Sequence, residues 1–134
     1  MSLSDISEPE WVEREVVNAA HDLSIAEHGG ASGLRDEGLL LSALDRPKNP
    51  HHYEGVADIP LLAATYAVGL AKNHPFADGN KRTAFIVCAA FLLRNGMRLT
   101  ADQVDSTTTM LAVASGEMEI DALADWIRAN SRAA

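Results

Sequence analysis

The chain has 134 residues, of which 47% are hydrophobic and 22% charged, a composition typical of one globular domain and not of a disordered or fibrous protein. Nineteen acidic against eleven basic residues give a net charge of −8, which argues against a protein that coats nucleic acid or an anionic membrane. The single cysteine, Cys88, excludes an intrachain disulfide. Residues 1–8 do not form a secretion signal, and the longest apolar run, 84–93, is too short to cross a bilayer, so we expect a soluble cytoplasmic protein.

The first half of the chain predicts two helices and a loop. Ser7 and Glu10 form a capping box for a helix that ends at Gly29-Gly30, and a short helix follows over about 37–46. The apolar face of the first helix is expected to consist of Val12, Val16, Ala19, Ala20 and Leu23. Residues 47–58 contain helix breakers and have no helical period, which predicts a loop or a small hairpin.

The second half predicts four more helices. Asp58 caps a helix with an almost uncharged face over 61–71, and the helix over 79–95 has an apolar run that predicts burial on all sides. Two helices follow at about 100–114 and 119–130, separated at Ser115-Gly116. No repeat or linker divides the chain, so residues 1–134 are expected to form a single all-α domain. We expect a compact bundle of about six helices around the central helix 79–95, with a possible small hairpin.

The connection between the two most apolar helices reads HPFADGNKR, residues 74–82. A helix N-terminus favours anions, so Lys81 and Arg82 in the first turn should each cost about 0.3–1 kcal/mol. A bound phosphate reverses that cost, because both cations, the Asn80 amide and the first-turn N–H groups then donate to it. Gly79 would let the backbone approach the phosphate closely.

Two further side chains of this connection have chemistry suited to phosphate transfer. Asp78 supplies a hard oxygen ligand for Mg²⁺ beside the phosphates, and His74 can act as a general base near neutral pH. Taken singly, His74 also fits a packed histidine at a helix end, and Asp78 fits an N-cap. The presence of all these groups within nine residues favours a functional site.

The motif at 74–82 resembles the signature of the Fic/Doc (Fido) family, in particular its death-on-curing branch. The resemblance covers nearly the whole chain, since several flanking segments match in order and spacing. These are His28-Gly29-Gly30, Gly33-Leu34-Arg35-Asp36, residues 39–44, Tyr53-Glu54 and residues 91–96.

The resemblance implies a role for each motif residue. His74 would deprotonate a target hydroxyl, Asp78 would bind the metal, and Phe76 would be a buried anchor. The phosphates of ATP would be held by Gly79, Asn80, Lys81 and Arg82. Tyr53 and Glu54 fall in the segment that forms a flap over the target peptide in the family.

Two departures from the AMP-transferring Fic pattern bear on the reaction. Lys81 stands where that pattern has glycine, and Phe85 stands where it has a second arginine. In the death-on-curing branch, an inverted nucleotide accompanies phosphorylation of a protein, elongation factor Tu. We therefore expect a toxin that phosphorylates a serine or threonine with ATP and Mg²⁺. Transfer of AMP by the same site, or a non-catalytic nucleotide-binding module, are the alternatives.

The resemblance also implies a partner. The inhibitory helix of self-inhibited Fic proteins is not found in this sequence, which implies inhibition in trans by an antitoxin tail. The remaining histidines, His21, His28, His51 and His52, are interpreted as packed or surface residues, and Cys88 as an inert core thiol.

Overall fold

The computed structural model describes residues 8–134, which form an all-helical domain with one small sheet, so the predicted fold class is confirmed. Seven helices are present in this part of the chain. They are α2 (Arg14–His28), α3 (Glu37–Asp45), α4 (Lys48–Glu54), α5 (Ile59–Asn73), α6 (Asn80–Arg94), α7 (Gln103–Ser115) and α8 (Ile120–Ala129). Strands β1 (Met97–Leu99) and β2 (Ser131–Ala133) pair antiparallel, with Arg98 opposite Arg132.

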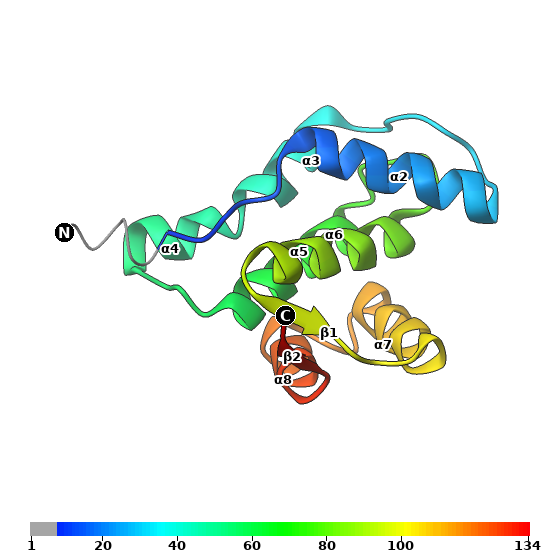
Figure 1. Ribbon diagram of the computed structural model, residues 1–134. Helices are drawn as coiled ribbons and strands as arrows, with labels where there is room; N and C mark the ends of the chain where they lie inside the picture. Colours follow the sequence, from blue (N-terminus) through cyan, green and yellow to red (C-terminus); the bar gives the residue numbers. More distant parts are fainter. Residues whose placement is uncertain (1–7) are drawn as a thin grey trace.

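Helix α5 is the centre of the domain. Every residue from Leu62 to Ala71 is buried, and α3, α6, α7 and α8 pack around it. Figure 1 shows this helix, in green, enclosed by its neighbours. The prediction that helix 79–95 is central was therefore wrong. Phe85 and Ile86 of that helix are only half-buried, because this face of α6 borders a cavity.

Side-chain caps fix where three helices begin. The carboxylates of Asp36, Asp58 and Asp102 accept hydrogen bonds from the backbone N–H groups of Leu39, Leu61 and Asp105. Such caps satisfy backbone donors that have no partner within the helix. The Asp58 cap and the ends of α3, α6 and α8 agree with the sequence predictions to within about two residues, and α7 begins at Gln103 rather than Thr100.

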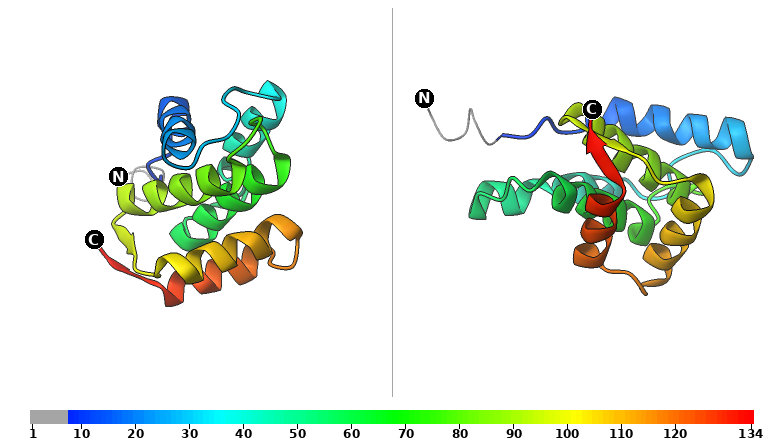
Figure 2. Two further views of the ribbon diagram at one scale, coloured as in Figure 1. Left: turned by 90° about the vertical axis from the view of Figure 1, so that its right-hand side faces the viewer. Right: turned by 60° about the horizontal axis from the view of Figure 1, so that its bottom comes forward.

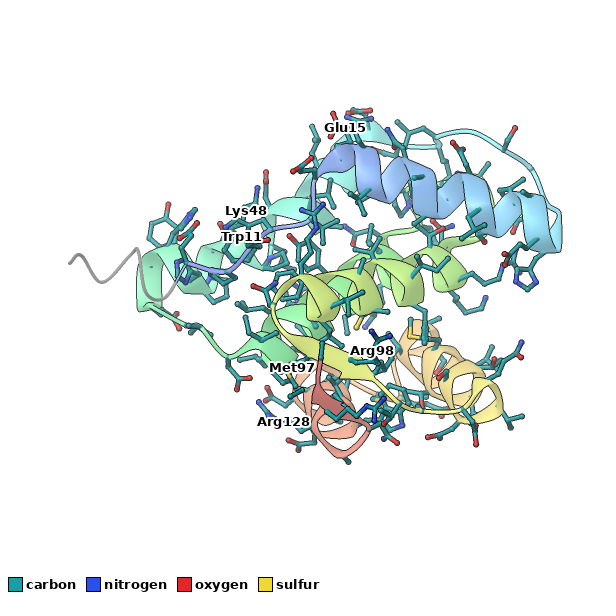
Figure 3. All side chains as sticks on the ribbon, viewed as in Figure 1. Trp11, Glu15, Lys48, Met97, Arg98 and Arg128 are labelled. Carbon is teal, nitrogen blue, oxygen red and sulfur yellow. The ribbon has the colours of Figure 1, made fainter. Side chains whose placement is uncertain are left out.

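The N-terminal segment differs from its prediction. Ser7 lies outside the described residues, and residues 8–13 are not helical, so α2 begins at Arg14. The segment is held instead by Trp11, which stacks on Phe91 with ring centroids 6.0 Å apart and meets His51 edge-on at 5.6 Å. Figure 3 labels Trp11 in this segment and Lys48 at the start of α4. An extended segment that packs by one large side chain does not show helical periodicity.

The loop or hairpin predicted for residues 47–58 is wrong, because Lys48–Glu54 form α4. Helix α4 ends at Gly55, which has φ 68° and ψ 20°. His51 is buried on it, where Nδ1 lies 3.0 Å from the Val56 carbonyl oxygen and Nε2 lies 2.7 Å from a Glu8 carboxylate oxygen. Within residues 8–134, no helix combines the length and apolar character needed to cross a membrane.

Helices α2, α6 and α7 form the side of the domain that carries the motif. Helix α6 lies between α2 and α7 and packs against both. The left view of Figure 2 shows the three helices one below another. The predicted apolar face of α2 is only partly right, since Val17, Ala20, His21 and Ser24 are the buried residues and Leu23 is half-exposed. Polar residues therefore face the motif.

Candidate active site

The turn between α5 and α6 places His74 in an unusual conformation. His74 ends α5 with φ 50° and ψ 55°, and it is the one non-glycine residue with positive φ in the described part of the chain. Its side chain is exposed. A left-handed conformation costs a non-glycine residue on the order of 1–3 kcal/mol, and such strain concentrates at functional sites. The chain therefore ends α5 in a strained turn that carries an accessible imidazole.

The connection between α2 and α3, residues 29–36, holds this turn in place. Arg35 donates from Nε to the His74 carbonyl at 2.7 Å and from a terminal nitrogen to the Asn73 carbonyl at 3.0 Å. The backbone N–H of Arg35 also donates to the Pro75 carbonyl at 2.7 Å, and that of Ala77 donates to the Gly33 carbonyl at 3.0 Å. The guanidinium satisfies carbonyls at the end of α5 that have no helical partner.

Phe76 is buried, as the sequence predicts for the motif's anchor. Its ring stacks on His21 of α2 with centroids 3.9 Å apart and planes 9° apart. His21 is itself buried, and its Nε2 lies 2.9 Å from the Asp78 carbonyl oxygen. Because a carbonyl only accepts hydrogen bonds, Nε2 carries the proton and donates. His21 thus supports the turn through both its ring and its N–H group.

The side chain of Asn80 is occupied within the turn. Its oxygen accepts from the Phe76 N–H at 3.0 Å, and its amide nitrogen donates to the Phe76 carbonyl at 3.0 Å. The same nitrogen lies 3.5 Å from Nδ1 of His74, a length that marks proximity more than a strong bond. The structure therefore gives the Asn80 amide a bracing role, whereas the sequence assigned it to the phosphates. The backbone N–H of Asn80 lies in the first turn of α6.

Asp78 is exposed, and one carboxylate oxygen accepts from the Gly79 N–H at 2.9 Å. The other carboxylate oxygen faces Gly30, where a Cβ added to that glycine would approach it to 2.5 Å. No group of three His, Cys, Asp or Glu side chains within residues 8–134 is arranged to hold a metal ion. One carboxylate oxygen that is not used in the turn fits Mg²⁺, which is commonly bound by one or two carboxylates with substrate phosphates and water.

The first turn of α6 is open to an anion. Gly79 is left-handed with φ 75° and approaches α2 so closely that a Cβ there would lie 3.1 Å from Ser24 Oγ. Lys81 is exposed and has no ion-pair partner among the described residues. Arg82 donates from Nε to Ser24 Oγ at 2.9 Å, and from a terminal nitrogen to the Gly29 carbonyl at 3.4 Å. Both cations thus stand at the positive end of α6, where no carboxylate of residues 8–134 forms an ion pair with them.

A cavity of about 620 Å³ begins at these two cations. It lies between α2, α6 and the first half of α7. Its lining comprises Ser24, Glu27, His28, Lys81, Arg82, Phe85, Ile86, Ala101, Gln103, Ser106, Thr107, Met110 and Leu111. A volume of this size is in the range of small-molecule sites.

The structure brings six of the predicted site residues together at one turn and leaves two apart. His74, Asp78, Gly79, Asn80, Lys81 and Arg82 lie on the turn between α5 and α6 and in the first turn of α6. Tyr53 and Glu54 form the end of α4, and Tyr53 is 85% exposed. Figure 1 shows α4 at the far end of the molecule from that turn. The segment that borders the motif is 29–36, which is paired with it through the Leu34 and Phe76 bridge.

Sequence reasoning missed three supporting residues. His21 and Ser24 lie on the buried face of α2, and Arg35 lies in the connection that follows. The sequence offered one signal for His21 and Ser24: they are polar residues spaced by about one helical turn, on the side of α2 away from Leu23. Arg35 belongs to a segment already noted for its resemblance, but only the fold shows that it reaches His74.

Comparisons with known proteins identify the family that this chain resembles. The model of the Fic/DOC family matches residues 11–92. The protein "Protein kinase doc" of Escherichia phage P1 is 34% identical over 114 residues, which is 85% of this chain and 90% of that protein. The protein "Toxin Doc" of Mycolicibacterium smegmatis is 38% identical over 120 residues, covering 86% of this chain and 88% of that protein.

Proposed function

Because this chain belongs to the Fic/DOC family, we propose that it is a toxin that transfers the terminal phosphoryl group of ATP to a serine or threonine hydroxyl of a target protein. Its relatives carry the names of a protein kinase and a toxin, which supports both parts of the proposal. The observation that carries it is the position of an exposed, strained His74 beside the cationic first turn of α6.

The proposed reaction is an in-line displacement. The target oxygen forms a bond to the γ-phosphorus, the bond from that phosphorus to the β,γ-bridging oxygen breaks, and ADP leaves. His74 takes the proton from the attacking hydroxyl. Lys81, Arg82 and the free N–H groups of α6 bind the phosphates and stabilise the charge that develops on them.

Asp78 would hold Mg²⁺ through its free carboxylate oxygen. When bound there, the ion would neutralise phosphate charge. Two other residues act by positioning. Asn80 braces the Phe76 backbone, and Arg35, from the connection between α2 and α3, fixes the His74 carbonyl. The protein has little covalent chemistry to perform, so orientation provides most of the catalysis.

Transfer of AMP is the second candidate function, and it would need the α-phosphorus to face His74. Phosphoryl transfer is favoured here because Phe85, which stands where the AMP-transferring pattern has its second arginine, lines an apolar part of the cavity. At this position an arginine that would bind phosphate is therefore replaced by an apolar residue of the cavity lining. We further propose that elongation factor Tu is the target and that a separate antitoxin protein is the inhibitor. All of these proteins would be located in the cytoplasm.

The test is label transfer to bacterial lysate with ATP labelled at either the α- or the γ-phosphate. We expect label from the γ-position alone and a peptide mass increased by one phosphate. A mass increase of one AMP would replace phosphorylation by the second candidate. His74→Ala should abolish transfer while leaving the helical circular dichroism unchanged, and transfer by that variant would remove His74 as the base. Wild-type chain that binds ATP and labels nothing would support the non-catalytic nucleotide-binding alternative.

A further inference from the structure

We propose that strand β2 docks an extended acidic segment of a partner protein. The segment adds a third strand along the outer edge of β2 and places a carboxylate beside Arg132 and Arg98. This surface is separate from the proposed phosphate site, because β1 follows the C-terminal end of α6 and the motif lies at the start of that helix. A helix of 15 residues spans about 22 Å, so the inference does not depend on the proposed function.

Two arginines face each other on the exposed side of the two-stranded sheet. Arg98 is opposite Arg132 in the antiparallel register, and both residues are exposed. Residues directly opposite each other have Cβ atoms about 4.5–5.5 Å apart, and like charges in that position destabilise a sheet. A negative charge supplied from outside the sheet removes this repulsion.

No described residue supplies that negative charge. Acidic residues outnumber basic ones by nineteen to eleven, yet neither Arg98 nor Arg132 forms an ion pair within residues 8–134. By contrast, Arg14, Arg94 and Arg128 each contact a carboxylate. The pair of free arginines therefore suits a partner that brings its own carboxylates. A short acidic segment fits better than a nucleic acid, because the net charge of −8 repels a long polyanion more strongly.

The outer edge of β2 offers backbone groups to such a segment. The sheet has only these two strands in the described part of the chain. The N–H of Ala134 donates to the Gly96 carbonyl at 2.9 Å, so the backbone groups of Ala134 point into the sheet. Successive residues of a strand direct their backbone groups to opposite sides. Those of Ser131 and Ala133 therefore point away from β1, toward the position of a third strand.

Of the two outer edges, that of β2 is the more accessible. Strand β1 also packs against α6, whereas β2 packs mainly against β1 and α8. Met97 and Leu99 of β1 are half-buried, but Arg132 and Ala133 of β2 are exposed. The left view of Figure 2 shows β2, in red, at the margin of the domain.

Strand addition explains why the charges matter. A residue of the added strand that lies opposite Arg132 shares its face of the sheet, at the spacing of a cross-strand pair. Arg98 adds its charge from one strand further away. Main-chain hydrogen bonds to an edge provide affinity for almost any extended segment, and the side chain opposite Arg132 then selects an acidic one.

The test is an NMR titration of the nitrogen-15-labelled chain with two peptides of about six residues. One peptide alternates glutamate with threonine and the other alternates glutamine with threonine, so both can form a strand and only the first is charged. We expect the glutamate peptide to shift the amide signals of residues 97–100 and 130–134 and to slow hydrogen exchange at Ser131 and Ala133. It should bind at least about fivefold more tightly than the glutamine peptide, and this advantage should shrink in about 0.5 M salt.

Substitutions separate the charges from the backbone edge. Arg132→Gln should raise the Kd of the glutamate peptide about five- to tenfold, and Arg98→Gln about two- to threefold because it lies one strand further away. Ala133→Pro removes the outward N–H without changing the charge, and proline is tolerated at a strand edge in this orientation. It should weaken the binding of both peptides several-fold. Arg46→Gln is the matched control, because Arg46 is also exposed and forms no ion pair among the described residues. Its Kd should stay within about twofold of the wild type.

Several outcomes would overturn the proposal. Equal binding of the two peptides, unchanged binding in Arg132→Gln, or no shift of the sheet signals would remove the acidic segment as the partner. Unchanged binding in Ala133→Pro would remove strand addition. A single-stranded oligonucleotide that binds this sheet more tightly than the glutamate peptide would assign the arginines to phosphate instead. Shifts of the same signals with rising protein concentration alone would assign the edge to a second copy of the chain.

Discussion

His21 and Phe76 stack face to face with their planes 9° apart, and the same imidazole donates from Nε2 to the carbonyl oxygen of Asp78 at 2.9 Å. One side chain of α2 therefore supports the hydrophobic anchor of the motif and the backbone of its carboxylate residue. Neither contact involves an atom that would touch a substrate. The two contacts can be separated by substitution.

His21→Phe keeps a ring to stack on Phe76 but cannot donate to Asp78, whereas His21→Gln keeps a donor and removes the ring. We expect His21→Phe to lower the turnover rate about tenfold with little loss of stability, because the Asp78 backbone loses its partner. His21→Gln should retain more activity but lower the free energy of unfolding by about 1–2 kcal/mol, since the aromatic contact is lost. Urea unfolding and steady-state transfer rates measure the two effects. Equal losses of activity in both variants would contradict the separate role of the hydrogen bond.

Gly30→Ala should disturb Asp78 through space. Its Cβ would lie 2.5 Å from the Asp78 carboxylate, which must move aside. We expect the Mg²⁺ concentration for half-maximal transfer to rise several-fold. Gly33→Ala is the control, because Gly33 also has positive φ but its Cβ would meet nothing within 4 Å. The control carries the backbone strain alone, so an equal shift in both variants would assign the effect to strain.

Tyr66→Phe should destabilise the domain without affecting transfer. The Tyr66 hydroxyl accepts from the Val12 N–H at 3.2 Å, and it ties the segment before α2 to the centre of α5. Burial, the largest cause, raises the pKa of this phenol above its usual value. Removing the hydroxyl leaves a buried N–H group unpaired, so the free energy of unfolding should fall by about 1–2 kcal/mol in urea titrations. Unchanged stability would mean that water replaces the bond.

Cys88 should remain unreactive in the folded protein, because burial raises the pKa of its thiol from 9.0 to about 12. The folded state keeps the proton that an unfolded chain releases above about pH 9. Stability should therefore fall as the pH rises from about 9 toward 12, by at most about 1.4 kcal/mol per pH unit. Cys88→Ala should lose this part of the pH dependence. Alkylation of the native thiol at pH 8, measured by mass, would contradict its burial.

The sequence predicted the ends of helices more completely than it predicted the core. Helix caps and glycine stops are local signals, so Asp58, Gly96 and Gly116 marked helix ends correctly. Phe85 and Ile86 misled the interpretation, because an apolar run does not distinguish burial in a core from the wall of a cavity. That same run made α6 look more central than α5, whose short side chains let its neighbours approach.

Supporting contacts between distant parts of the chain could not be predicted from spacing alone. Arg35 reaches His74 across 39 residues, and Arg82 reaches Ser24 across 58. Residues 47–58 were misread because Pro50 and Gly55 were taken as helix breakers. Pro50 lies in the first turn of α4, where proline is tolerated, and Gly55 ends the helix. Packing of His51 against Trp11 holds α4 on the domain. Tertiary contacts of this kind override local propensity.

The left-handed turn at His74 is held by Arg35 and by backbone hydrogen bonds from the α2–α3 connection. A chain in which this connection is not docked would contain the whole motif without the contacts that hold His74 in place. Under the proposed function, transfer would therefore require α2, the connection after it and the turn before α6 to be folded together.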